Sequence, residues 1–332
     1  MLVDTTPAHA RLVSVAGYRP RARVGNAELV RAGALDTSDE WIRQRTGITA
    51  RHLADDTEPI EYLGARAART AVRRAGLAMA DIDCVIAATM SHARHGRSLA
   101  RGIADRLTPA PRAALDVNAA CAGFCYALEM ARTLIGGRTF ERIVVVGAER
   151  MSDIVDHGDR TTRVIFADGA GAAVVCRSGE PGIAAPVWGS DTACRDFLTR
   201  PAGAGPDGAR APWTPGHLKM QGPALYRWVH AHVPEAARAA VRRAGVRLED
   251  LRVFVPHQAN DRMISGIVAA LDLPPTVTVA RDITRTGNTS AASIPLALDA
   301  LLHRDPTLSG ELALLIGFGA GLSYAAQVVV VP

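Results

Sequence analysis

The sequence predicts a duplicated α/β fold, through an internal repeat and the apolar pattern of its strands. The segment Thr70–Met90 (TAVRRAGLAMADIDCVIAATM) closely matches the segment Ala239–Asn260 (AAVRRAGVRLEDLRVFVPHQAN). Both segments show the pattern of an amphipathic helix, a glycine that ends it, an acidic turn and a buried strand. An offset of roughly 170 positions also relates other segments, as an internal duplication would produce.

Two further pairs of segments extend the repeat. DVNAACAGFCYALEMARTLI matches RTGNTSAASIPLALDALLH, since both are openings to apolar helices that are rich in small residues. ERIVVVGAERM matches ELALLIGFGAG, since both are short apolar strands that end in glycine. Continuous apolar runs of this kind are typical of sheets that helices cover on both faces. We therefore expect two similar halves, residues 1–180 and 181–332, that meet near residues 179–186.

The helices that begin near Cys121 and Thr289 are rich in Ala, Gly and Ser, so other elements can approach them closely. We expect them to be two central helices that pack against each other between the sheets. This arrangement would bring Cys121 close to the GNTS loop of the other half. The segment Ser190–Pro215 has glycine and proline punctuation without periodicity, and it predicts a surface excursion that lines a site.

Composition limits the classes of function. The chain has 332 residues, 48% of them hydrophobic, and a formal net charge of +5. Aromatic residues make up only 5% and no basic run interleaves with them, so we expect no nucleic-acid partner. The sequence has no signal-peptide pattern and no apolar run of about eighteen residues, so we expect a cytoplasmic protein without a membrane partner.

The five cysteines predict free thiols and not a disulfide framework, because their number is odd and no secretion signal precedes them. No CxxC pair, HExxH motif or zinc-spaced cluster of Cys and His occurs, so we expect neither a metal site nor a resident cofactor.

Cys121 is the candidate nucleophile. It follows the predicted strand PRAALDVN and begins a helix, where the helix dipole and exposed N–H groups are expected to lower the pKa of a thiol. Cys125 lies one turn deeper on the same face, where sulfur serves as a small hydrophobic group.

Two polar residues of the second half are expected near Cys121. His257 follows the buried strand VFV and a proline, at the kind of strand end where α/β active sites form. Asn288 lies in a Gly-Asn-Thr-Ser turn, where an asparagine is more often a helix cap than a catalyst. Each signal alone is weak, but the duplication would bring all three side chains into one cleft.

The motifs AACAGFCYAL, VPHQAN, GNTSAASIPLALDALL, DTSDEWIRQRTGI and IFADGAGAAVV closely resemble those of the β-ketoacyl-acyl-carrier-protein synthase III family, within the thiolase superfamily. The resemblance runs from about Leu12 to Val331. It implies a thiolase-like five-layer α-β-α-β-α fold of two duplicated halves, and a homodimer.

The resemblance also implies roles for the three residues. Cys121 would take an acyl group from acyl-coenzyme A as a thioester. His257 and Asn288 would bind the thioester carbonyl of malonyl-acyl-carrier protein and stabilise the enolate formed as carbon dioxide leaves. A second oxyanion hole, made of the backbone N–H groups of Cys121 and Ala320, would hold the tetrahedral oxygen of the condensation.

Binding residues follow from the same resemblance. Trp41 and Arg160 match residues that sandwich the adenine of coenzyme A. Arg45 and Arg262 match positions near the phosphates and the tunnel mouth, and Asn260 belongs to the same coenzyme A site. In many relatives an aromatic residue or threonine at the position of Gly96 closes the acyl pocket of the partner subunit. Glycine at this position predicts a roomier pocket and a starter other than acetyl.

Competing functions remain open at this stage. A biosynthetic thiolase needs a late second cysteine, and none follows Cys194. A type III polyketide synthase shares the Cys-His-Asn chemistry, but the HQAN, GNTSAAS and DEW motifs point elsewhere. The main alternative is an acyltransferase that moves an acyl group from Cys121 to a hydroxyl, an amine or a carrier thiol without decarboxylation. A catalytically silent partner subunit would usually have lost the nucleophile.

Overall fold

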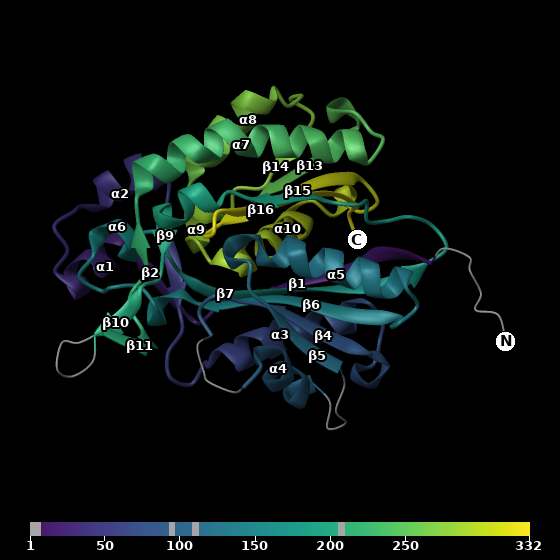
Figure 1. The fold of residues 1–332 in the computed structure, drawn as a ribbon, viewed down its shortest axis with the longest axis horizontal. Coiled ribbons are helices and arrows are strands. Elements are labelled where there is room, and N and C mark those ends of the chain that lie inside the picture. The colour runs from purple at the N-terminus through teal and green to yellow at the C-terminus, as the bar shows by residue number, and fades with distance from the viewer. Residues whose placement is uncertain (1–7, 93–96, 108–112, 205–209) are drawn as a thin grey trace.

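The computed structural model describes residues 8–92, 97–107, 113–204 and 210–332. Its main elements form five layers, in which two sheets alternate with three layers of helices (Figure 1). This arrangement confirms the predicted α-β-α-β-α architecture. Among the described residues, no helix is both long and apolar enough to cross a membrane.

The two sheets repeat one strand pattern. The first sheet has the order β1-β7-β6-β4-β5, and the second has the order β8-β16-β15-β13-β14. In each sheet the last three strands run parallel and the first two pair antiparallel with their neighbours. Their bounds are β1 His9–Tyr18, β4 Cys84–Ala88, β5 Ala113–Val117, β6 Arg142–Arg150 and β7 Asp168–Ser178, then β8 Val187–Ser190, β13 Val253–Pro256, β14 Thr278–Val279, β15 Leu312–Gly319 and β16 Ser323–Val330. The internal repeat of the sequence is therefore visible as two sheets of the same topology.

Helices fill the three other layers (Figure 1). The helices α3 (Ile60–Arg74) and α4 (Leu99–Leu107) cover the outer face of the first sheet, and α7 (Gly222–Arg243) and α8 (Asp261–Leu271) cover that of the second. Between the sheets lie α5 (Gly123–Gly136) and α10 (Ser293–Arg304). These are the two central helices that the small-residue openings predict.

The remaining elements are short and lie around one end of the sheets (Figure 1). They are α1 Asn26–Gly33, α2 Asp39–Thr46, α6 Arg160–Arg163 and α9 Ile283–Thr286, with the paired strands β2 Ala22–Gly25 and β3 Ala50–Leu53, β9 Leu198–Thr199 and β12 Lys219–Met220, and β10 Ala202–Ala204 and β11 Arg210–Pro215. The segment predicted as an excursion thus contains short strands.

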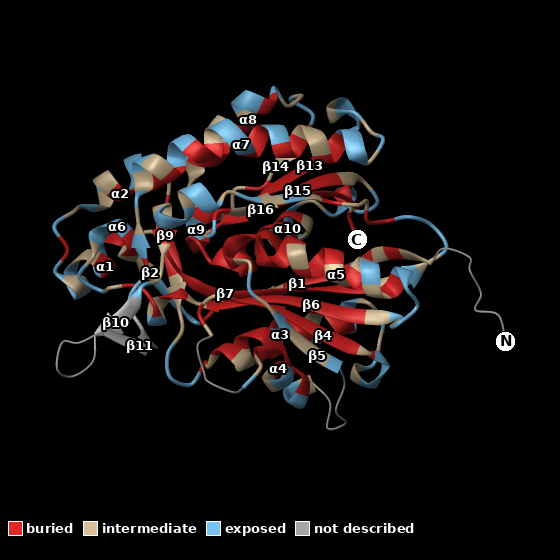
Figure 2. Ribbon diagram, viewed as in Figure 1, coloured by how far each residue is buried: buried red, intermediate tan, exposed pale blue. Residues whose placement is uncertain are grey.

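The two sheets and most of the central helices between them are buried (Figure 2). On α5, Phe124, Leu128 and Ile135 recur at helical spacing and are buried, as are Ile294 and Leu298 on α10. They join side chains from both sheets in one hydrophobic cluster. Because this cluster contains residues of both sheets, the two halves share one core. Burying each such side chain stabilises the fold by about 1.5–3 kcal/mol.

Two glycines allow the central helices to approach the strands. A Cβ on Gly147 of β6 would lie 2.3 Å from the carbonyl oxygen of Ala291, and one on Gly317 of β15 would lie 2.8 Å from Cα of Ala122. Each strand therefore needs glycine where the start of the other half's central helix passes over it. This close approach places the helix starts, and with them Cys121, at the interface between the halves.

Candidate active site

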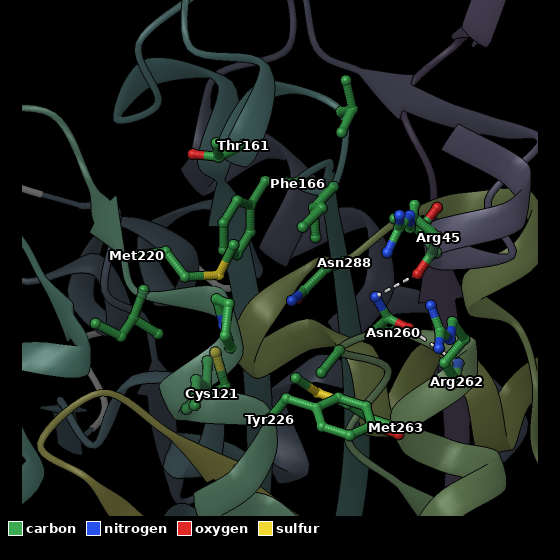
Figure 3. Close-up of a pocket in the computed structure, with 18 of the residues that line it drawn as sticks. Arg45, Cys121, Thr161, Phe166, Met220, Tyr226, Asn260, Arg262, Met263 and Asn288 are labelled. Carbon is green, nitrogen blue, oxygen red and sulfur yellow. Dashed lines mark hydrogen bonds between the residues drawn. The ribbon is translucent and has the colours of Figure 1, made fainter. Parts of the chain in front are cut away.

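Cys121, His257 and Asn288 line one cavity of about 420 Å³. They come from the start of the first central helix, the end of β13 and the turn before the second central helix. Figure 3 shows Cys121 and Asn288 projecting into the same space, with Phe166 and Met220 beside them. The cleft predicted from the duplication is thus present, and it is made by both halves.

Cys121 lies in a short 3₁₀ helix, Ala120–Ala122, that leads directly into α5. Only 2% of the residue is exposed. Burial raises the pKa of its thiol to about 12, and the charge of Glu149 adds to the rise, while a polar contact with Ser290 opposes it. This direction is opposite to the lowered pKa expected from the helix N-terminus, because the desolvation of a fully buried thiolate outweighs the helix dipole. The thiol is therefore protonated before substrate is bound.

Gly319, the last residue of β15, lies directly against the nucleophile. A Cβ at this position would approach the backbone nitrogen of Cys121 to 2.7 Å, so only glycine fits. Ala320, the predicted partner of Cys121 in an oxyanion hole, follows immediately and is partly buried. The close approach of Gly319 is a feature that sequence reasoning missed, although the GFGAG motif carries the signal.

His257 is 2% exposed and is fixed by its surroundings. Its backbone N–H donates to the carbonyl of Ile316, and its imidazole meets the Phe318 ring in a T-shaped contact with ring centroids 5.2 Å apart. Burial lowers the pKa of His257 to about 3. The imidazole is consequently neutral at physiological pH.

Ser293 lies against one ring nitrogen of His257. The backbone N–H of Gln258 donates to Ser293 Oγ, and this oxygen lies 2.7 Å from His257 Nδ1. The Ser293 hydroxyl can donate to Nδ1 at this distance, and in that tautomer the neutral ring carries its proton on Nε2. Ser293 was not identified from the sequence, because a serine in GNTSAAS carries no signal for a contact with a histidine 36 positions away.

Asn288 is 4% exposed, and its backbone is held by hydrogen bonds to Ile165 and Ala167. Its Oδ1 accepts from the backbone N–H of Ser290 at 2.8 Å. The Nδ2 group is thereby left to donate into the cavity. His257 and Asn288 thus each engage an acceptor atom internally and present an N–H donor, which is the arrangement that stabilises a developing oxyanion.

The predicted coenzyme A residues also line the cavity, at its mouth. They are Trp41, Arg45, Arg160, Asn260 and Arg262. The guanidinium carbons of Arg160 and Arg45 lie 5.4 Å and 5.9 Å from the Trp41 ring centroid. A purine between Trp41 and Arg160 therefore requires the two side chains to separate.

Asn260 connects the two halves at this mouth. Its Nδ2 donates to the backbone carbonyl of Arg45, and its Oδ1 caps α8 by accepting from the N–H of Arg262 (Figure 3). Phe166, Met220 and Leu225 give the cavity an apolar wall that the sequence did not predict. Leu198 adds to this wall from the segment that was expected to line a site. Gly96, the predicted acyl-pocket residue, lies outside the described residues. Among the residues that are described, no cluster of three potential metal ligands occurs.

Comparisons with known proteins give the family. A family model for 3-oxoacyl-[acyl-carrier-protein (ACP)] synthase III matches residues 115–192, and the model for its C-terminal part matches residues 241–331. The β-ketoacyl-[acyl-carrier-protein] synthase III of Streptomyces glaucescens is 42% identical over 333 residues, which are 98% of this chain and 97% of that protein. The chain belongs to the β-ketoacyl-[acyl-carrier-protein] synthase III family.

Solved structures agree with this membership of the β-ketoacyl-[acyl-carrier-protein] synthase III family. The priming β-ketosynthase from the R1128 polyketide biosynthetic pathway is similar with a TM-score of 0.94 and 41% identity, over 100% of this chain and 98% of that one. The 3-oxoacyl-[acyl-carrier-protein] synthase III of Aquifex aeolicus gives 0.87 and 34%, over 96% and 99%. The protein is an acyltransferase of this family, as its motifs predict.

Proposed function

We propose that the protein catalyses a decarboxylating Claisen condensation between an acyl group, taken from acyl-coenzyme A, and malonyl-acyl-carrier protein. The product, a β-ketoacyl-carrier protein, would prime fatty-acid or polyketide synthesis. The observation that supports this most strongly is the pair of N–H donors, His257 Nε2 and Asn288 Nδ2, beside Cys121 in one buried cavity. A simple acyl transfer from Cys121 does not need a second pair of donors.

The reaction begins with acylation. Cys121 attacks the thioester carbonyl of acyl-coenzyme A, and the coenzyme leaves as a thiol. Trp41 and the guanidinium groups of Arg45 and Arg262 are suited to the adenine and phosphates, because arginine offers both a planar stacking surface and several donors. Asn260 fixes the position of Arg45 by donating a hydrogen bond to its backbone carbonyl.

Decarboxylation follows at the second pair of donors. As carbon dioxide leaves the malonyl group, the electron pair of the broken C–C bond passes into an enolate, whose oxygen accepts from His257 and Asn288. A neutral imidazole suits this task, because it donates without giving up its proton to the enolate. The enolate carbon then attacks acyl-Cys121, and the backbone N–H groups of Cys121 and Ala320 are proposed to hold the tetrahedral oxygen.

The partners follow from this chemistry. They are acyl-coenzyme A and malonyl-acyl-carrier protein as substrates. The homodimer and the absence of a resident cofactor are proposed from the family resemblance. A roomy acyl pocket at Gly96, and hence a starter other than acetyl, stays a prediction, as does the cytoplasmic location. Intact-mass measurement of acylated Cys121 over a panel of acetyl-, isobutyryl- and longer acyl-coenzyme A tests the starter, and a strict preference for acetyl would contradict it.

The deciding experiment measures labelled carbon dioxide released from malonyl-acyl-carrier protein with and without acyl-coenzyme A. We expect release coupled to β-ketoacyl product, and loss of the product in Cys121→Ala. Transfer of the acyl group from Cys121 to a hydroxyl, amine or carrier thiol, without carbon dioxide release, would overturn the proposal in favour of the simple acyltransferase.

A further inference from the structure

Ser290 is an unusual residue beside the nucleophile. It is fully buried and its backbone has a φ of 48°, in the left-handed region that side chains other than glycine rarely adopt. Its Oγ has no partner at regular hydrogen-bond geometry, although it is in weaker polar contact with the Cys121 thiol and the Glu149 carboxylate. The unsatisfied hydroxyl is unfavourable for stability, and such costs concentrate at functional sites.

Glu149 is the second unusual group. It lies on β6 and is fully buried, and among the described residues it has no cationic partner in an ion pair. Its carboxylate accepts instead from the loop after β4, namely from Thr89 Oγ1, Met90 N, Ser91 N and Ser91 Oγ. It also lies 3.4 Å from the backbone nitrogen of Ala291, beside Ser290. Burial raises the pKa of this carboxyl group, so it is a better proton acceptor than an exposed glutamate.

The duplication shows that the fold itself requires neither group. Ser290 begins the 3₁₀ helix before α10, and the matching residue before α5 is Ala120, whose φ is 47°. Glu149 stands two residues after Gly147, and Gly319 stands two residues after the matching Gly317. The other half therefore builds the same structure with a methyl group and a hydrogen atom.

The cavity offers no better acceptor for the thiol proton. Acylation requires the Cys121 thiol to lose its proton, and the imidazole of His257 is the other candidate base in the cavity lining. When the Ser293 hydroxyl donates to Nδ1, the Nε2 atom of His257 carries the ring proton, and burial lowers the pKa of the ring to about 3. The imidazole is therefore a donor and not a base.

We propose that Ser290 and Glu149 form a proton relay that takes the thiol proton of Cys121 when the acyl group is loaded. The Sγ–H bond breaks as the proton passes to Ser290 Oγ, and the hydroxyl proton of Ser290 passes to a carboxylate oxygen of Glu149. The electron pair left on Sγ attacks the acyl carbonyl, and the departing coenzyme A thiolate takes a proton from water. When the condensation later releases Cys121 as a thiolate, the proton returns from Glu149 by the same path.

The relay also keeps the net charge of the buried site constant. A thiolate formed next to an ionised Glu149 would place two anions together, which the low-dielectric interior strongly disfavours. When the proton moves from one group to the other, the site carries one negative charge before and after the transfer.

The test uses the full chain and iodoacetamide, with alkylation of Cys121 followed by peptide mass against pH. This reaction needs neither acyl-coenzyme A nor a malonyl substrate. The relay rests on the proposed function, but the two can fail separately. Alkylation of Cys121 can be independent of Ser290 while labelled carbon dioxide is still released, and alkylation can depend on Ser290 when no carbon dioxide is released. The half-buried Cys176 and Cys194 serve as internal references.

Ser290→Ala is the main variant, because Ala120 shows that alanine adopts this backbone in the same fold. We expect Cys121 alkylation at pH 7 to slow by roughly 10- to 100-fold, while the Tm stays equal or rises because a buried unsatisfied hydroxyl is removed. The control is Ser14→Ala, which removes a buried hydroxyl that donates to the carbonyl of Ala71. It should lower the Tm and leave the alkylation unchanged. An unchanged alkylation rate in Ser290→Ala would overturn the relay.

Glu149→Gln separates the relay from simple charge repulsion, because the two predict opposite signs. Without an acceptor for the proton, alkylation of Cys121 slows. If Glu149 acts only through its negative charge, its removal favours the thiolate and alkylation becomes faster, which would contradict the proposal. Should this variant fold poorly, the pH profile of Ser290→Ala still decides, since the relay requires its alkylation midpoint to move to higher pH.

Discussion

At the scale of single residues, the site depends on which atoms are already occupied. Asn288 uses its oxygen for the N–H of Ser290, and His257 uses Nδ1 for the hydroxyl of Ser293. The atom of each side chain that is left to face the cavity is a nitrogen, and in both cases it offers an N–H donor. Donors prepared in this way act without reorganisation when negative charge develops.

Asn288→Ala removes one of the two donors. We expect decarboxylation to fall by roughly 10²–10³-fold, while acylation of Cys121 by acyl-coenzyme A continues, because that step uses the other oxyanion hole. Carbon dioxide release and intact mass, measured on the same preparation, check this. Equal losses in both steps would place Asn288 in a structural role.

Ser293→Ala removes the hydroxyl proton that is available to His257 Nδ1. The ring can then adopt the other tautomer, in which Nε2 has no proton to donate, so we expect decarboxylation to slow by about 10-fold with little change in the KM for acyl-coenzyme A. Ser293→Thr retains the hydroxyl and should restore most of the rate. A lower Tm without a change in rate would show that Ser293 serves packing alone.

The pH dependence of stability should reflect His257. Its pKa is about 3 in the folded protein and 6.5 in its ordinary state, so between these values the unfolded chain binds more protons. His257 therefore contributes stability above about pH 6.5, which is lost as the pH falls toward 3. Urea unfolding at pH 7.5 and pH 5 should show a smaller loss of stability for His257→Asn than for the unchanged protein. An identical loss would mean that the ring is protonated in the folded state.

At the scale of elements, the position of the nucleophile depends on the contact between strands and central helices. Gly147 and Gly317 allow backbone to meet backbone, because a Cβ at either position would overlap the helix start of the other half. The glycines that end the predicted strands in the sequence have this physical cause. Gly319 extends the same contact to Cys121 itself.

Gly147→Ala should destabilise the protein by about 3 kcal/mol, because the new methyl group meets a backbone carbonyl that cannot rotate away. The matched control is Gly179→Ala, whose Cβ would meet nothing within 4 Å. Urea unfolding of both variants measures the difference. Equal stabilities would show that the central helices can move apart at little cost.

At the scale of the whole molecule, the sequence was sufficient to predict the architecture. It did not predict the polar contacts that surround the three site residues. Repeats such as AVRRAG and the paired small-residue helices predict two halves and a common cleft, because they are local patterns with a known period. The family motifs indicate Cys121, His257 and Asn288. By contrast, Ser290, Ser293 and Glu149 act through contacts between segments distant in the chain, and a serine or a glutamate has no periodic signature that reveals such a contact.

The shared core predicts that neither half is stable alone. The apolar side chains of α5 and α10 lie in one cluster with strands of both sheets. We expect residues 1–180 expressed alone to aggregate, and coexpression with residues 181–332 to recover soluble protein that is acylated at Cys121. A soluble, cooperatively unfolding fragment of residues 1–180 would contradict this.

The matching strand orders have a consequence for catalysis. The counterpart of Cys121 in the second half is Ala291, whose N–H faces the Glu149 carboxylate where that of Cys121 faces Gly319. A cysteine introduced at residue 291 would therefore meet an anion in place of an open backbone. The two helix starts therefore differ in their surroundings, because one carries the nucleophile beside Gly319 and the other packs against a carboxylate. We expect that Ala291→Cys alone would not create a second catalytic centre.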